Sequence, residues 1–206
     1  MTKTALIVVD MQNDFVLPNG SLYVPGAENL IEGINEQIRD DRYDLIVASQ
    51  DWHPPEHGSF ASNHPEGHEV GEIVDLDGLD QILWPDHCVQ GTEGAEFVEG
   101  LDVERFDRVF QKGTDPLVDS YSAFYDNDHR KSTGLTNYLR DKGIDEVHVC
   151  GVALNFCCLY TCIDSAQTEG FDTSLLYNIT GGVEMEEGDI ARALKDILDA
   201  GASILT

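Results

Sequence analysis

Short apolar runs alternate with segments of helical periodicity along the chain. Strand-like runs occur at 5–9, 44–49, 107–111, 145–151, 173–177 and 202–206. Apolar residues at helical spacing predict helices over 27–40, 130–142, 155–169 and 188–199. Because strands this apolar suit a sheet that is covered on both faces, the pattern predicts an α/β fold, a three-layer α/β/α sandwich around a mostly parallel six-stranded sheet.

One long stretch, at about 51–94, interrupts this alternation. It is rich in Gly, Pro, His and Asp, it carries five of the seven histidines, and its one predicted element is an edge strand at 72–76. A long irregular insert in a compact domain is usually a functional loop or a lid. Shorter irregular stretches are expected at 10–25 and 112–128. Since no repeat or linker divides the chain, residues 1–206 are predicted to form one domain.

The charge of the chain limits its partners and its setting. The formal net charge is −27, from 39 acidic and 12 basic residues, and such a surface repels nucleic acid and anionic membranes. High ionic strength would screen this repulsion, which favours a halophilic source over an acidic mesophilic one. No leader peptide or membrane span is recognisable, and the cysteines are odd in number without a CxxC pair, so a cytoplasmic protein is expected. A homo-oligomer is compatible with this composition.

The turn GVALNFCC at 151–158 joins a predicted strand to a predicted helix. Cys157 therefore lies in the first helical turn, where the positive end of the helix dipole favours the nucleophilic thiolate. Adjacent helix residues point about 100° apart, so Cys158 is expected to pack into the core instead. Taken alone, Cys157 fits a buried structural cysteine at least as well, and its interpretation depends on the other strand ends.

Polar or ionisable residues follow three further strands. Asp10 follows the first strand, Asp51 and His53 follow the second, and Lys112 follows the third. Because the ligand site of an open parallel sheet lies beyond the carboxyl ends of its strands, these side chains are expected to converge with Cys157 at one edge. Strands also end in polar residues simply because they reach solvent, but that explanation fits single residues better than the whole set.

Six motifs resemble the isochorismatase-like cysteine hydrolases, and within them the nicotinamidase/pyrazinamidase branch. They are DMQNDF (10–15), DWHPPEHGSF (51–60), WPDHC (84–88), KGTDP (112–116), YSAF (121–124) and GVALNFC (151–157). The motifs occur in the family's order over most of the chain. The DxH and WPxHC motifs are the ones that resemble the metal site of the nicotinamidase branch.

The resemblance implies a role for each strand-end residue. Cys157 is the expected nucleophile, Asp10 the base that takes the thiol proton and later protonates ammonia, and Lys112 the cation that keeps these two compatible. The backbone amides of Ala153 and Cys157 are expected to form the oxyanion hole, next to a cis peptide between Val152 and Ala153.

The resemblance also implies a metal ion and an aromatic wall. Asp51, His53 and His87 are the expected ligands of one divalent ion, with His57 as a fourth candidate; zinc is favoured, and iron or manganese would also suit these donors. The ion is expected to orient the ring of the substrate rather than to activate the cysteine. The aromatic residues expected against that ring are Phe15, Trp84 and Tyr121.

One part of the nucleophile turn departs from the family pattern. Leu154 and Asn155 stand where family members often have Thr-Asp. The loss of this carboxylate is expected to alter local hydrogen bonds, although Asn155 can still cap the helix.

The expected activity is hydrolysis of nicotinamide, and also of pyrazinamide, through a thioester, as in NAD salvage. Two alternatives stay open at this point. A related cysteine hydrolase acting on a carbamoyl or ureido compound would have no use for the histidines, and a catalytically silent module would have no use for the cysteine. Isochorismate hydrolysis itself needs no cysteine nucleophile, so Cys157 counts against that reaction.

Overall fold

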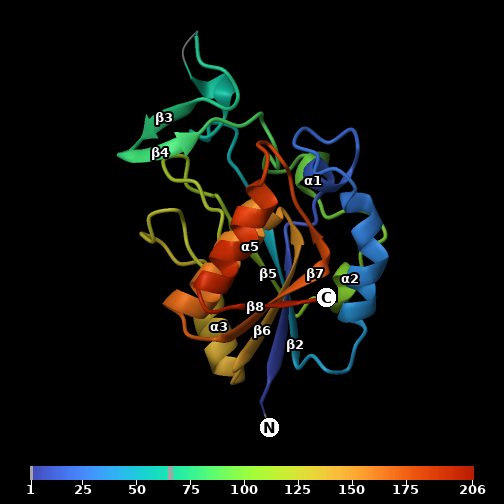
Figure 1. Ribbon diagram of the computed structural model, residues 1–206. Helices are drawn as coiled ribbons and strands as arrows, with labels where there is room; N and C mark the ends of the chain where they lie inside the picture. The colour runs from blue at the N-terminus through green and yellow to red at the C-terminus, as the bar shows by residue number, and fades with distance from the viewer. Residues whose placement is uncertain (1, 65–66) are drawn as a thin grey trace.

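The centre of the molecule is a six-stranded sheet in the order β5-β2-β1-β6-β7-β8, with every neighbouring pair parallel (Figure 1). The computed structural model describes residues 2–64 and 67–206. Its main strands are β1 (Thr4–Val9), β2 (Leu45–Asp51), β5 (Arg108–Lys112), β6 (Glu146–Val152), β7 (Asp172–Gly181) and β8 (Ser203–Leu205). The predicted parallel α/β sheet is confirmed.

Helices cover both faces of this sheet (Figure 1). They are α1 (Asn13–Val16), α2 (Ile31–Ile38), α3 (Leu135–Lys142), α4 (Leu159–Ile163) and α5 (Asp189–Asp199). Successive residues of β1 alternate between two cores: Ala5 and Ile7 pack with buried residues of α3, α4 and α5, while Leu6 and Val8 pack with those of α1 and α2. This period of two is what the pleat of a strand imposes, and it makes the three layers.

The insert differs from the prediction. The stretch predicted as an edge strand at 72–76 is not part of the main sheet: β3 (Ile73–Leu76) pairs antiparallel with β4 (Leu79–Ile82) as a separate hairpin. Asp77 and Gly78 form its turn with φ values of 52° and 89°. An Asp-Gly pair with positive φ at both residues is the favoured two-residue hairpin turn, and this signal was present in the sequence.

Two helix predictions also need correction. The helix expected over 130–142 begins only at Leu135, because Gly134 takes a left-handed conformation and the hydroxyl of Thr133 bonds back to the carbonyl of Ala123. The helix expected over 155–169 changes its winding, with π-helical turns on both sides of α4. Among residues 2–64 and 67–206, no helix has the length and apolar character needed to cross a bilayer.

Candidate active site

The carboxyl ends of the strands bring the predicted catalytic residues together. Asp10 directly follows β1 with a φ of 48°, and Asp51 and Lys112 end β2 and β5 as a register pair. Cys157 follows β6 in the π-helical turn Leu154–Cys158. Suitable donor atoms of Asp10, Asp51 and Cys157 lie within 4.8 Å of one another. All four side chains are buried, so their charges interact with little screening by solvent.

Lys112 lies between the two carboxylates and the thiol. Its Nζ donates to Asp51 Oδ1 at 2.5 Å, to the carbonyl of Ser120 at 2.9 Å and to Cys157 Sγ at 3.5 Å. It also lies 2.9 Å from Asp10 Oδ2 as an ion pair. Apart from this ion pair, Asp10 Oδ2 has no hydrogen-bond partner among the described residues. That oxygen is free to accept a proton.

The thiol of Cys157 does not behave as the helix dipole alone predicts. Burial raises its pKa well above the usual value, and the attraction of Lys112 only partly offsets this. Burial likewise raises the pKa of Asp10. For Lys112, burial works to lower the pKa, but Asp10 and Asp51 outweigh it and keep the ammonium charged. Burial thus opposes the thiolate that the helix dipole favours, and this is consistent with the predicted role of Asp10 as the base that takes the thiol proton.

A cavity of about 260 Å³ opens above this group. All three predicted aromatic residues line it, together with Cys157 and Ala153. The indole nitrogen of Trp84 donates to the hydroxyl of Tyr121 at 3.2 Å. A flat apolar wall with a few polar groups at its floor suits a neutral aromatic ligand.

The turn that carries Cys157 has the expected backbone. The Val152–Ala153 peptide is cis, and Cys158 is fully buried in the core as predicted. The expected capping role of Asn155 is wrong. Its side chain instead holds Val183, donating to the carbonyl at 2.9 Å and accepting from the N–H at 3.0 Å. Val183 also lines the cavity.

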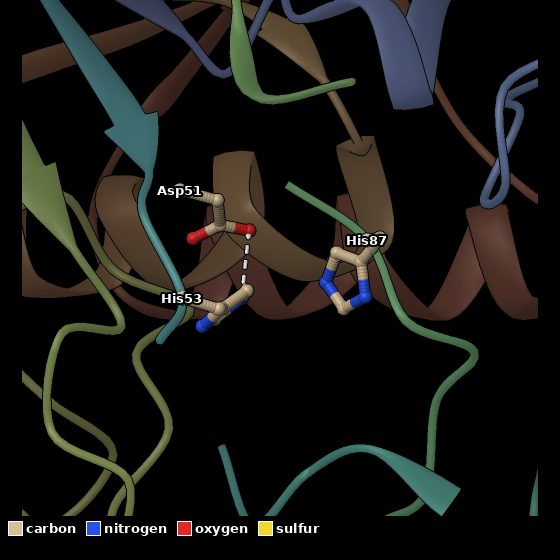
Figure 2. A group of neighbouring side chains, drawn as sticks. All are labelled: Asp51, His53 and His87. Atoms are coloured by element: carbon tan, nitrogen blue, oxygen red, sulfur yellow. Dashed lines mark ion pairs between the residues drawn. The ribbon is translucent and has the colours of Figure 1, made fainter. Parts of the chain in front are cut away.

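Asp51, His53 and His87 meet beside the same cavity, which Asp51 and His87 line. Their ligand atoms lie within 4.8 Å of one another, and all three residues are buried. Figure 2 shows Asp51 at the end of its strand, His53 below it, and His87 reaching in from a separate segment. His53 Nε2 is 3.6 Å from Asp51 Oδ2 and has no hydrogen-bond partner among the described residues. A buried polar atom without a partner is costly, so this nitrogen fits a metal ligand.

Local hydrogen bonds distinguish the three imidazoles of this site. The Nδ1 atoms of His53 and His87 face the carbonyls of Gly113 and Pro85 at 2.8 and 2.7 Å. Only a protonated Nδ1 can bond to a carbonyl, so in its neutral form each ring presents the lone pair of Nε2, as metal-binding histidines do.

His57 has the opposite arrangement. Its Nδ1 lies 2.7 Å from the Ser59 hydroxyl and accepts the Ser59 backbone N–H at 3.2 Å, and burial lowers its pKa to about 4. An Nδ1 that accepts favours the neutral tautomer with the proton on Nε2, which can donate to a bound group. His57 Nε2 is also buried without a hydrogen-bond partner among the described residues, so its role as a fourth ligand stays a prediction.

Several residues of the site escaped the sequence analysis. Asp119 is buried, lines the cavity and can share an ion with His53 and His57. Phe156 packs against Trp84 with ring centroids 5.2 Å apart. Asp119 lies within a stretch read only as a loop, where no periodicity marks a buried residue. Phe156 lies inside the quoted nucleophile motif and could have been included in the aromatic wall.

Comparisons with known proteins agree with this geometry. The Isochorismatase domain profile matches residues 4–206. The chain belongs to the isochorismatase family. It is 43% identical to a nicotinamidase of Escherichia coli over 100% of this chain and 96% of that protein.

Solved structures of family members are similar throughout the chain. A nicotinamidase/pyrazinamidase of Acinetobacter baumannii has a TM-score of 0.93 and 39% identity, covering 100% of this chain and 97% of that one. A pyrazinamidase of Pyrococcus horikoshii, solved in complex with zinc, has a TM-score of 0.80 and 36% identity, covering 99% of both chains. The isochorismatase-like fold predicted from the motifs is thus confirmed.

Proposed function

We propose that this protein is a metal-dependent nicotinamidase that hydrolyses nicotinamide to nicotinate and ammonia, and also accepts pyrazinamide. The observation that carries the proposal is one aromatic cavity lined by Cys157, Asp51 and His87. Asp10 and Lys112 are buried directly behind the thiol, and His53 completes the candidate ligand group with Asp51 and His87. The nicotinamidase and pyrazinamidase relatives described above support this choice of substrate. A carbamoyl or ureido substrate would leave the imidazole group without a purpose.

The reaction begins with a proton transfer inside the protein. Cys157 gives its proton to Asp10 as its sulfur attacks the amide carbon, and Lys112 stabilises the developing thiolate. The backbone amides of Ala153 and Cys157 are proposed to stabilise the oxyanion. Asp10 then returns the proton to the leaving nitrogen, so ammonia departs and a thioester stays on Cys157. Water hydrolyses the thioester, which releases nicotinate and restores the thiol.

The ion is proposed to be held by Asp51, His53 and His87, with zinc favoured. When bound, it would supply a Lewis acid for the ring nitrogen of the substrate, and this would orient the amide toward the cysteine. The apolar wall of Phe15, Trp84 and Tyr121 holds the faces of the ring. In the tautomer with its proton on Nε2, His57 would donate to a group bound beside the ion.

The remaining features of the proposal concern the whole protein. We propose that residues 1–206 act as one domain, with the insert at about 51–94 serving the cavity, in a cytoplasmic enzyme of NAD salvage. All five cysteines are free in the structure, which suits a reducing compartment. The strongly acidic surface disfavours nucleic acid and anionic membranes as partners.

The direct test is to incubate the purified protein with nicotinamide in molar KCl and to measure ammonia and nicotinate. Equal amounts of both products are expected, with turnover lost in Cys157→Ala and lowered by a chelator. The absence of hydrolysis by protein loaded with zinc, iron or manganese in turn would contradict the proposal.

A further inference from the structure

One buried hydroxyl in the sheet has no role in the chemistry described so far. Ser49 lies on β2, two residues before Asp51 and on the same side of the strand, and it is 1% exposed. Its Oγ donates to Asp10 Oδ1 at 2.6 Å. Ser49 does not line the cavity, so it has no direct access to a ligand there.

The hydrogen bonds of the carboxylate show why this contact matters. Lys112 donates to Asp51, Ser120 and Cys157 and forms an ion pair with Asp10 Oδ2 at 2.9 Å, so it acts on only one of the two oxygens of Asp10. Among residues 2–64 and 67–206, Ser49 is the hydrogen-bond donor to the other oxygen, Asp10 Oδ1. An ion pair sets the distance between charges, whereas a hydrogen bond sets direction.

We propose that Ser49 is a positioning residue, which holds Asp10 Oδ1 so that Oδ2 stays turned toward the thiol of Cys157. Without the hydroxyl, the carboxylate can rotate about its last bond and present both oxygens to the ammonium of Lys112. The thiol would then lose an aligned acceptor for its proton. The test by nicotinamide turnover rests on the proposed function. The test by alkylation of Cys157 does not.

The kinetic readout uses Ser49→Ala, Ser49→Thr and the control Ser165→Ala. Ser165 is also fully buried and bonds another hydroxyl, that of Thr173 at 2.7 Å, so its removal reports the general cost of deleting a buried hydroxyl. We expect Ser49→Ala to lower kcat for nicotinamide about ten- to hundredfold with KM nearly unchanged, as for loss of one hydrogen bond to a charged group. Ser49→Thr, which keeps the hydroxyl, should restore kcat to within a few-fold of the unchanged protein.

The chemical readout is the rate at which iodoacetamide modifies Cys157, followed by peptide mass spectrometry in the folded proteins. It should fall in Ser49→Ala and recover in Ser49→Thr, while Ser165→Ala changes melting temperature alone. If the unchanged protein does not hydrolyse nicotinamide, the proposed function fails, and the alkylation rates still test Ser49. A folded Ser49→Ala with unchanged kcat and alkylation rate, or a folded Ser49→Thr as impaired as the alanine variant, would overturn the inference.

Discussion

The triad at the strand ends, which comprises Asp10, Lys112 and Cys157, is held together by contacts between its own side chains. In contrast, the Nε2 atoms of His53 and His57 have no hydrogen-bond partner among the described residues. In the triad the one oxygen without a donor, Asp10 Oδ2, lies beside a thiol that can supply a proton. In the histidine cluster, which we define as His53, His57 and His87, the Nε2 atoms of His53 and His57 have no hydrogen-bond partner within residues 2–64 and 67–206. The first group is arranged for proton transfer, and the second for a ligand from outside.

Asp51 belongs to both regions. Its Oδ1 accepts from Lys112 at 2.5 Å, while its Oδ2 faces His53 at 3.6 Å. Burial works to raise the pKa of Asp51, but Lys112 and then His53 outweigh it and keep the carboxylate ionised. Asp51 can therefore serve as a metal ligand close to Cys157 and still keep its ion pair with Lys112.

The largest effect expected belongs to the triad. Cys157→Ala should lower nicotinamide turnover by at least about 10⁴-fold, because no other group at the floor of the cavity can form the thioester. Cys158→Ala is the matched control, since Cys158 is buried in the core and should retain most activity in an ammonia-release assay. A thioester found on Cys158 by mass spectrometry would reverse the assignment.

The next effect separates the members of the histidine cluster. His87→Ala should weaken binding of the ion by about 100-fold, because a ligand is lost. His57→Ala should leave one bound ion per chain, since its Nε2 carries a proton. Metal content after dialysis measures both, and the exposed His68→Ala serves as the control. Loss of the ion in His57→Ala would show that its ring changes tautomer and coordinates.

A smaller effect is expected at the rim of the cavity. Asn155→Asp removes the donor to the Val183 carbonyl and places a negative charge against it, so KM should rise about fivefold with kcat little changed. Asn137→Asp adds the same charge on the exposed side of α3 and should change neither constant. The KM values of both variants are measured by steady-state kinetics. Equal KM values would contradict this interpretation of Asn155.

Added salt should raise the stability of the protein through its charged surface and leave the reactivity of the buried triad unchanged. With a formal charge of −27, the melting temperature is expected to rise by about 10 °C between dilute buffer and molar KCl as surface repulsion is screened. The alkylation rate of Cys157 in folded protein should change little, because the triad is buried. Equal melting temperatures in dilute and concentrated salt would remove the inference of a halophilic source.

The positions of the triad could be predicted because they follow from the pattern of strands. Once β1, β2 and β5 are parallel, Asp10, Asp51 and Lys112 must meet at one edge. The proton states could not be predicted in the same way. The pKa of Cys157 depends on how deeply the fold buries it, and the tautomer of His57 depends on one backbone N–H two residues away. The contact of Ser49 with Asp10 could not be predicted, because a single serine does not change the apolar pattern of a strand.

The division of labour between the two regions can be measured on one preparation with and without its ion. The nicotinamide kcat/KM and the alkylation rate of Cys157 are determined before chelation, after chelation and after zinc is restored. We expect kcat/KM to fall about 100-fold on chelation and to recover with zinc, while the alkylation rate stays within about threefold throughout. Unchanged nicotinamide hydrolysis without the ion, or a parallel fall of both rates, would contradict the account.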